Sequence, residues 1–471
     1  GLAASKMEVV MDFRDAIDSE RNKTPLTDSQ ISAWDKIVDH KVTAVWGPPG
    51  TGKTHFLAAL IVGFCRASAR TNRPCRILVT AMTHAAIENV LKKVVAFDRE
   101  SELVVGKVRG MKSEAFPTVR NVEKKAVDEW LRSNRVSVLG STVWGLTDST
   151  TPFDIVIIDE ASQLKVPDAS IPLCRVAPTG RFVAAGDHFQ LGPIVAGEYP
   201  EPPPGEPVLQ ASIFDLLIER PGRPGAPLCQ LLENWRMCDV LTHASKILYG
   251  PDYACASTEV ASRRLHLARH RDGLISACLN PDHPLVLVIL DGIKGGKVNE
   301  AEAKLVADLA LALREDGSDT ADDQDFWRER LFIVSPHHVQ ISAIRLALAS
   351  VRNWSAKPFV DTVEKMQGQE ADSVIISYGV SDPEYAASEA EFIYSRNRLN
   401  VSITRARSKS VVFIPRPLLD ATPEVLDCRE VAEGLGYMRD LANLTRKDGT
   451  ITEFSLEDGV SAEVIGLGTV G

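Results

Sequence analysis

The sequence predicts an α/β protein with two parallel sheets flanked by helices, and three observations favour this fold class. The chain has 471 residues, which leaves room for two substantial cores. Its hydrophobic fraction of 44% and charged fraction of 25% are ordinary for a globular protein. Short runs rich in Val and Ile alternate with amphipathic stretches, as buried parallel strands alternate with crossover helices.

The apolar runs fall into two groups along the chain. The first group comprises 42–46, 76–81, 136–140, 154–158 and 182–185. The second group comprises 285–290, 331–334, 373–378 and 410–413. We therefore expect two sheets, one built from each group.

Two turn-rich stretches, 197–207 and 221–227, separate the groups, because their prolines cannot continue a helix or a central strand. The weakly periodic segment 251–284 is expected to form loops and short helices. The expected organisation is a first domain at 1–222 with a short insertion near 98–135, a second domain at 223–418, and a C-terminal extension at 419–471.

Composition excludes several protein classes. The eight cysteines include no C-x-x-C pair, which predicts reduced, mostly buried thiols instead of a zinc or redox site. No apolar run reaches the ~18 residues that a membrane span needs, and no charged-then-apolar leader opens the chain, so a cytoplasmic location is expected. The start at Gly1 suggests a fragment of a longer protein. The net charge of −10 argues against coating nucleic acid by bulk electrostatics, although a narrow basic groove would still be compatible with it.

The strongest local pattern is GPPGTGKT at 47–54, directly after the first apolar run and before an amphipathic stretch. Glycines let backbone N–H groups turn inward around phosphates, Lys53 reaches the terminal phosphates, and the Thr54 hydroxyl can hold Mg²⁺. The predicted nucleotide-binding residues of this loop are Gly47, Pro48, Gly50, Thr51, Gly52, Lys53 and Thr54. The pattern does not say what nucleotide hydrolysis would drive.

Two further polar groups follow apolar runs. Asp159 and Glu160 follow the run at 154–158, where Asp159 can face Mg²⁺ and Glu160 can orient or deprotonate the attacking water. Gly186 to Leu191 follows the run at 182–185, and its Gln190 could report the presence of the γ-phosphate. By itself this last pattern fits a plain turn as well.

These three motifs resemble the first half of a superfamily 1 helicase of the 5′-to-3′ branch, typified by the nonsense-mediated-decay helicase. The resemblance implies two RecA-like P-loop domains with an ATP cleft between them. It also implies that Gln30, in Leu26-Thr27-Asp28-Ser29-Gln30, recognises adenine. Thr83 and His84 lie in a segment similar to motif Ia, and Thr142 in one similar to motif Ic; both motifs contact the bound strand.

The second half continues the resemblance. Asn234-Trp235-Arg236-Met237 is similar to the element in which an aromatic ring packs on the base and an arginine meets the γ-phosphate. The segment with Pro336 resembles a strand-contacting element, and the one with Thr362, Gly368 and Glu370 resembles motif V, which links the nucleotide and nucleic-acid sites. In the segment similar to motif VI, Arg405 is the implied second arginine finger.

Several residues depart from the family pattern: Met82, His84, His188, Phe189, Trp235 and His337. Trp235 preserves a π-face for stacking. The other changes concern strand binding and coupling more than ATP chemistry, so they affect the expectation of unwinding more than that of hydrolysis.

The sequence thus predicts an ATP- and Mg²⁺-dependent motor on single-stranded DNA or RNA, monomeric, with the catalytic residues Lys53, Glu160, Gln190, Arg236 and Arg405. The family often joins this engine to a nuclease or accessory domain, for which an upstream position is expected. Two alternatives stay open: a P-loop ATPase switch without a polynucleotide partner, and a nucleic-acid clamp or remodeller that hydrolyses ATP without separating strands.

Overall fold

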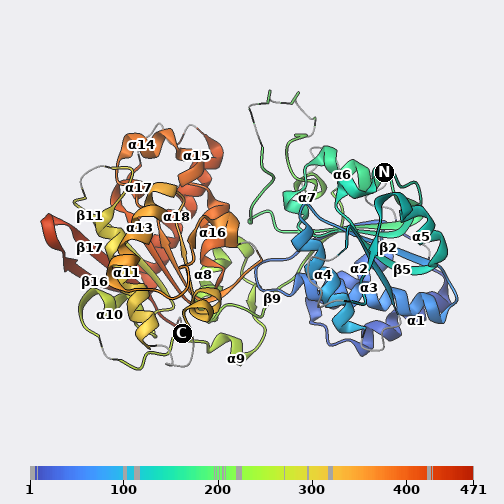
Figure 1. Cartoon of the computed structure of the whole chain (residues 1–471), viewed down its shortest axis with the longest axis horizontal. Helices are drawn as coiled ribbons and strands as arrows, with labels where there is room; N and C mark the ends of the chain where they lie inside the picture. Colours follow the sequence, from blue (N-terminus) through green and yellow to red (C-terminus); the bar gives the residue numbers. More distant parts are fainter. Residues whose placement is uncertain are drawn as a thin grey trace. The chain divides into compact units, whose positions relative to one another are not determined.

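The computed structural model describes residues 6–469, apart from 8, 99–102, 111–116, 196, 198, 201, 204–205, 207, 219–224, 270, 294–295, 317–321, 367, 422–425 and 427. The chain divides into two compact units, Gly1–Glu233 and Asn234–Gly471 (Figure 1). We call them unit 1 and unit 2. The boundary expected between residues 222 and 223 lies outside the described residues.

Unit 1 contains an eight-stranded sheet in the order β4-β3-β5-β2-β6-β7-β1-β8, and every pairing in it is parallel. The strands are β1 (Val42–Trp46), β2 (Cys75–Thr80), β3 (Val104–Val108), β4 (Arg120–Val122), β5 (Val136–Gly140), β6 (Phe153–Ile158), β7 (Val176–Gly186) and β8 (Leu228–Gln230). The predicted parallel sheet is confirmed. The described part of the expected insertion, 98–135, extends this sheet through β3 and β4.

Helices cover both faces of the first sheet. They are α1 (Met11–Lys23), α2 (Asp28–Asp39), α3 (Lys53–Arg70), α4 (His84–Phe97), α5 (Val127–Ser133), α6 (Val166–Leu173) and α7 (Ile213–Ile218), with 3₁₀ turns η1 (Lys124–Ala126), η2 (Val143–Leu146) and η3 (Ala161–Gln163). One apolar core lies between helices α1, α2, α3 and α4 and one face of the sheet. A second core lies between helices α5, α6 and α7 and the other face. Helix α3 is apolar on most sides because it lies within the first of these cores.

Unit 2 contains a seven-stranded sheet in the order β13-β12-β14-β15-β11-β17-β16. The strands are β11 (Leu285–Asp291), β12 (Leu331–Val334), β13 (Val360–Asp361), β14 (Ala371–Ser377), β15 (Ala406–Pro415), β16 (Thr450–Ser455) and β17 (Ser461–Leu467). The first five in spatial order are parallel, whereas β17 and β16 pair antiparallel. The expected C-terminal extension therefore supplies the outer edge of this sheet, as Figure 1 shows.

The remaining elements of unit 2 lie around this sheet. They are α8 (Asp239–Tyr249), α9 (Thr258–Ala261), α10 (Gly273–Leu279), α11 (Glu300–Asp316), α12 (Asp323–Asp325), the π-turn η4 (Phe326–Arg330), α13 (His338–Val351), η5 (Val363–Met366), α14 (Pro383–Ser388), α15 (Ala390–Ile393), α16 (Arg396–Ile403), α17 (Arg416–Leu419), α18 (Arg429–Asp448) and η7 (Glu457–Gly459). A small ladder pairs β9 (Glu233–Asn234) with β10 (Ala254–Cys255). The described part of segment 251–284 consists of loops and short elements, as predicted.

Two composition-based expectations can be checked. All eight cysteines are free thiols and five are buried, as expected. Among the helices that the structure describes, none combines the length and apolarity needed to cross a membrane.

Parallel strands end at one edge of a sheet, which we call the carboxyl edge, and begin at the opposite amino edge. Ligands of such sheets bind beyond the carboxyl ends. In unit 1, the loops after β1, β2, β5, β6 and β7 all leave from the carboxyl edge, and these loops carry every motif predicted in this half except the Gln30 segment.

Candidate functional site

The phosphate-binding pattern forms a loop between β1 and α3. Gly50 and Gly52 have φ values of 75° and 72°, which residues with a Cβ rarely adopt. The loop is closed by Thr51, whose hydroxyl donates to the Pro48 carbonyl at 2.8 Å. A Cβ on Gly47 would lie 2.9 Å from the Lys53 side chain, so glycine is needed there for the lysine to pass.

Lys53 lies between two carboxylates at the end of β6. Its ammonium is 3.1 Å from Asp159 Oδ1 and 2.9 Å from Glu160 Oε1. Although burial lowers the pKa of Lys53, the two carboxylates raise it well above its usual value. Burial, together with Glu160, raises the pKa of Asp159 in spite of Lys53. The Lys53 ammonium is thus paired with both the Asp159 and the Glu160 carboxylates.

The backbone at Glu160 is strained. Its φ of 52° is in the left-handed region, which is uncommon for a residue other than glycine. The Glu160 N–H donates to Asp159 Oδ1 at 2.9 Å, and the Gln163 amide donates to Glu160 Oε2 at 3.4 Å. Strain of this kind persists where the surrounding structure requires one side-chain direction, here that of the Glu160 carboxylate toward Lys53.

The donors at this point fit Mg²⁺. Thr54, on the first turn of α3, offers a hydroxyl, and Asp159 offers a carboxylate that is only 2% exposed. Mg²⁺ prefers hard oxygen ligands and commonly takes one or two from the protein and the rest from phosphates and water. In the part of the chain that the structure describes, no group of three or more His, Cys, Asp or Glu is arranged to hold a metal. The remaining ligands would come from a bound nucleotide and water.

The loop after β7 is organised by Asp187. This buried carboxylate accepts from Trp46 Nε1 at 3.0 Å, from the Phe189 N–H at 3.1 Å and from Gln190 Nε2 at 2.8 Å. Trp46 is the last residue of β1, so the bond joins this loop to the strand that precedes the phosphate loop. The His188 ring lies 4.6 Å from the Trp46 ring. Gln190, predicted to report on the γ-phosphate, is therefore held beside β1.

Gln30 is bonded to the phosphate loop. Its side-chain oxygen accepts from the Thr27 N–H at 3.2 Å in a capping box on α2, and its amide nitrogen donates to the Thr51 carbonyl at 3.2 Å. Glu233 accepts from the Thr27 hydroxyl at 2.7 Å and from the Ser29 N–H at 3.3 Å. The last residue of unit 1 is thus fastened to the helix that carries Gln30. Adenine recognition by Gln30 stays a prediction.

The predicted strand-contacting residues of unit 1 lie at the ends of neighbouring strands. Thr83 and His84 follow β2, and Thr142 follows β5. The exposed Thr83 caps α4, because its hydroxyl oxygen accepts from the Ala86 N–H at 3.2 Å. Thr142 precedes η2 and makes no side-chain cap bond. Thr83 is therefore a helix cap, a structural role that Thr142 does not have.

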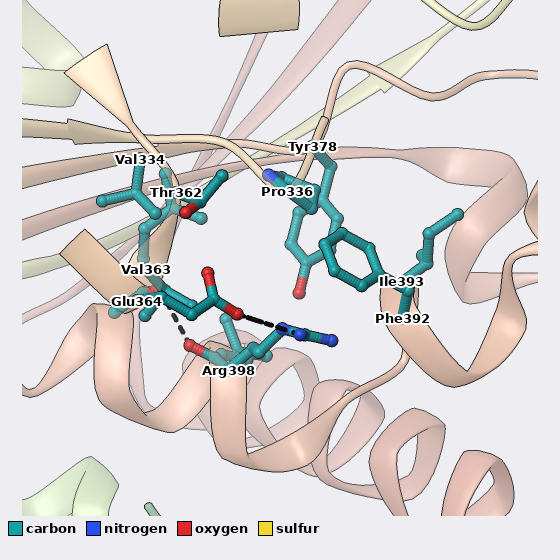
Figure 2. Close-up of a pocket in the computed structure, with 12 residues that line it drawn as sticks. Val334, Pro336, Thr362, Val363, Glu364, Tyr378, Phe392, Ile393 and Arg398 are labelled. Atoms are coloured by element: carbon teal, nitrogen blue, oxygen red, sulfur yellow. Dashed lines mark hydrogen bonds and ion pairs between the residues drawn. The ribbon is translucent and has the colours of Figure 1, made fainter. Parts of the chain in front are cut away.

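At the carboxyl edge of unit 2, Pro336 and Thr362 follow β12 and β13 and rim a small cavity, shown in Figure 2. Arg398 lies across it: its Nη2 is 2.9 Å from Glu364 Oε1, and its guanidinium lies 3.9 Å from the Phe392 ring centre. Burial raises the pKa of Glu364, but bonds from its own backbone, Thr362 and Arg398 lower it overall. The space that the centre of a water molecule can occupy in this cavity is about 20 Å³. The cavity therefore has room for about one water molecule and is too small for a nucleobase.

The amino edge of unit 2 carries the predicted arginines. Glu370, just before β14, is bonded by Arg236 Nε at 2.7 Å and by Arg407 Nε at 3.0 Å. Arg236 also donates to the Thr404 carbonyl at 3.1 Å. Burial raises the pKa of Glu370, but Arg236 and Arg407 lower it overall. Arg405 is 3% exposed and donates to the Gln369 carbonyl at 3.5 Å.

Two other predicted nucleotide-binding residues lie near this group in the chain. Gly368 has a φ of 75° in the exposed turn before β14. Trp235 is 49% exposed beside Arg236, and its carbonyl accepts from Arg263 Nη1 at 3.0 Å. The exposed indole agrees with the expectation of a stacking face at this position.

Three residues that organise these sites had no assigned role. They are Asp187, Glu233 and Arg407. Arg407 could have been recognised, because it is an arginine only two residues after Arg405 in the segment similar to motif VI. Asp187 and Glu233 gave no such signal, since their partners are up to 206 residues away in the sequence.

Comparison with protein families gives matches in both units. Two family models, each described as AAA domain, match this chain: one at residues 25–137 and 100–198, the other at 209–415. Each model thus covers a large part of one unit.

Curated relatives match across both units. The DNA replication ATP-dependent helicase/nuclease JHS1 of Arabidopsis thaliana is 27% identical over 424 residues, covering 84% of this chain and 29% of that protein. DNA2 of Homo sapiens is 26% identical over 432 residues, covering 84% of this chain and 38% of that protein. DNA2 of Saccharomyces cerevisiae is 25% identical, covering 88% and 28% respectively. The chain spans about a third of the length of these relatives.

A solved structure also matches. "The structure of PRRSV helicase" shares 15% identity and a TM-score of 0.38, covering 82% of this chain and 54% of that chain. At this TM-score the match carries no further conclusion about either unit.

Proposed function

We propose that this chain is the motor part of a superfamily 1 helicase, an enzyme that hydrolyses ATP to move along a single nucleic-acid strand, in the 5′-to-3′ direction. The relatives are named DNA replication helicase/nucleases, which favours DNA as the strand. A nuclease would then belong to the part of such proteins that this chain does not span.

The single observation that carries the proposal is the shared carboxyl edge of unit 1. The phosphate loop and the acidic pair follow β1 and β6, and the strand motifs follow β2 and β5, with β2 hydrogen-bonded to both β5 and β6. Asp159 N–H donates to the Thr80 carbonyl at 2.9 Å, so the last residue of β2 is bonded directly to the predicted Mg²⁺ ligand. A movement at the nucleotide site would therefore reach the loop after β2 through this hydrogen bond.

In the proposed reaction, Lys53 and the loop amides bind the β- and γ-phosphates, and Glu160 orients the attacking water. Mg²⁺, held by Thr54 and Asp159, supplies charge neutralisation for the phosphates. Phosphoryl transfer also needs positive charge on the other side of the γ-phosphate, which one phosphate loop does not supply. Arg236 and Arg405 of unit 2 are proposed to supply it.

The decisive experiment is an ATPase titration with single-stranded DNA and with single-stranded RNA. Strand stimulation is expected, with DNA the stronger activator. Hydrolysis that is the same with and without either strand would support the alternative of a switch ATPase and overturn the proposal.

Strand displacement separates a helicase from a clamp. Duplexes with a 5′ or a 3′ single-stranded tail would be incubated with the protein and ATP. Displacement of the 5′-tailed duplex alone is expected. Stimulated hydrolysis without displacement or movement on either substrate would favour the clamp or remodeller.

A further inference from the structure

An exposed tryptophan lies directly after the predicted strand-contacting Thr142. Trp144 is in the 3₁₀ turn η2 and is 57% exposed. Three residues make one turn of a 3₁₀ helix, so Val143 and Leu146 share a side, and both are buried in the core. Trp144 consequently projects away from that core.

The turn that carries Trp144 is tightly built. The Gly145 N–H donates to the Thr142 carbonyl at 2.9 Å, and a Cβ on Gly145 would lie 2.3 Å from Ser141 Oγ. No larger residue fits at Gly145 without a shift. The indole of Trp144 is therefore presented on a hydrogen-bonded turn, and an ordered turn lowers the entropy lost when the side chain binds a ligand.

A second large apolar side chain is exposed on the neighbouring loop. Met82, after β2, is 48% exposed. Strands β2 and β5 are paired with Val79 opposite Gly140, and the Ser141 N–H donates to the Val79 carbonyl at 3.0 Å. The loops that follow these strands therefore leave the sheet side by side. We call Met82, Thr83, Thr142 and Trp144 the edge patch.

The edge patch combines hydroxyl groups with exposed apolar side chains. Two hydroxyl groups can donate to phosphate oxygens, and two polarisable apolar side chains offer flat or soft surface. Arg109, exposed at the end of the next strand, β3, adds positive charge at the same edge, since Lys107 pairs with Gly140 in the sheet register. Unpaired strands present these complementary features: charged phosphates and base faces that every nucleotide has.

We propose that Trp144, with Met82 beside it, is a stacking site for one unpaired nucleobase of the strand whose phosphates Thr83 and Thr142 bind. This inference rests on the proposed function and adds to it a base contact in unit 1. Stacking of this kind is independent of base sequence. It contributes about 1–3 kcal/mol per base, which is about 5- to 150-fold in affinity.

The test uses oligodeoxynucleotides in which a single abasic residue is moved position by position along the strand. For the unaltered protein, one position is expected to weaken binding by about 5- to 150-fold, because the base is absent while the phosphate remains. Trp144→Ala should bind the intact strand more weakly by the same factor and show no further loss at that position. Trp144→Phe should restore most of the affinity.

The salt dependence and a matched variant complete the design. Trp144→Ala should leave the slope of log affinity against log salt unchanged, because no phosphate contact is lost. Leu228→Ala, which truncates an exposed apolar residue at the amino edge of the same sheet, should bind as the unaltered protein does.

Equal affinity of Trp144→Ala and the unaltered protein for intact and abasic strands, with normal strand stimulation of the ATPase, would overturn this inference and leave the proposed function intact. An unaltered protein that neither binds strands nor responds to them would instead overturn the proposed function itself.

Discussion

The two units place the side chains with predicted functions differently on similar sheets. In unit 1, the residues predicted to meet nucleotide and those predicted to meet the strand leave the same carboxyl edge. In unit 2, Pro336 and Thr362 follow strands at the carboxyl edge, whereas Glu370 and Arg405 precede strands at the amino edge. Strand β14, with seven residues, spans about 20 Å between these edges.

This difference indicates how each unit would transmit a change. In unit 1, the two predicted sites are adjacent loops, so a small movement of one loop reaches the other through a bond such as that between Asp159 and Thr80. In unit 2, the sheet itself separates the two predicted sites, so a change at one site would reach the other only through the sheet.

The largest effect is expected at the amino edge of unit 2. Arg405→Ala should slow ATP hydrolysis by about 10³-fold, because arginine fingers contribute roughly 10³–10⁵-fold to the rate. ATP affinity, measured with a fluorescent analogue, should change little. Arg405→Lys, which keeps the charge, should recover part of the rate.

The matched control is Arg330→Ala, since Arg330 is 57% exposed and pairs with Asp372 at the same edge. Its rate should stay within about two-fold, as expected for a surface ion pair. If Arg405→Ala bound ATP more weakly and hydrolysed it at the normal rate, the amino edge of unit 2 would carry no arginine finger. The two units would then not differ in the way described.

The next effect is expected in unit 1 at Glu160. Glu160→Gln should reduce hydrolysis by about 10²-fold, the lower end of the usual 10²–10⁴-fold contribution of a general base, while ATP binding persists. The amide keeps the shape and the left-handed backbone is unchanged, so the loss reports the charge. Near-normal turnover in this variant would show that the acidic pair has no role in activating water.

Most of the fold and part of the site follow from local sequence. The apolar runs predicted both sheets because buried parallel strands need continuous apolar residues, and the loop at 47–54 was predicted because glycine and lysine spacing is dictated by the phosphate. Glu370 was predicted only by resemblance, and its partner Arg407 was not assigned.

The rest depended on contacts that sequence patterns do not encode. Strands β16 and β17 contain no recognisable motif, yet they complete the second sheet. Strand β17 pairs with β11, which lies more than 160 residues earlier, and β16 pairs with β17. Asp187 was part of a short turn-like pattern, and only the fold brings Trp46 Nε1 to it. Local pattern therefore predicts which segments are buried, whereas long-range pairing decides which polar groups meet.

A buried acid contacts the end of β14 at the carboxyl edge of unit 2. Glu302 on α11 is fully buried, and its carboxylate accepts from Ser377 Oγ at 2.6 Å, the Gly379 N–H at 3.1 Å and Asn299 Nδ2 at 3.2 Å. Burial nevertheless raises the pKa of Glu302 from 4.5 to about 8. The pKa of Glu302 is therefore higher in the folded protein than in the unfolded one. Its contribution to the free energy of unfolding is full below pH ~4.5 and is lost as the pH rises to about 8.

Glu302→Gln removes this titration. The free energy of unfolding of the unaltered protein, relative to the variant, should therefore fall by a few kcal/mol between pH 5 and pH 9, as measured in urea. Glu300→Gln, exposed two residues earlier on the same helix, should follow the unaltered protein. Parallel curves for Glu302→Gln and the unaltered protein would mean that Glu302 does not titrate in this range.

The smallest effect is expected for the strand contact of unit 2. Thr362→Val keeps the shape of the side chain and removes one hydroxyl, so strand affinity should fall by about five-fold, the equivalent of one hydrogen bond. Basal hydrolysis without a strand should not change, because Thr362 and the arginines are at opposite edges of the sheet. Thr452→Val, exposed on β16 at the far end of the same sheet, provides the control. A Thr362→Val variant with slower basal hydrolysis and unchanged strand affinity would mean that the two edges of unit 2 do not serve two different ligands.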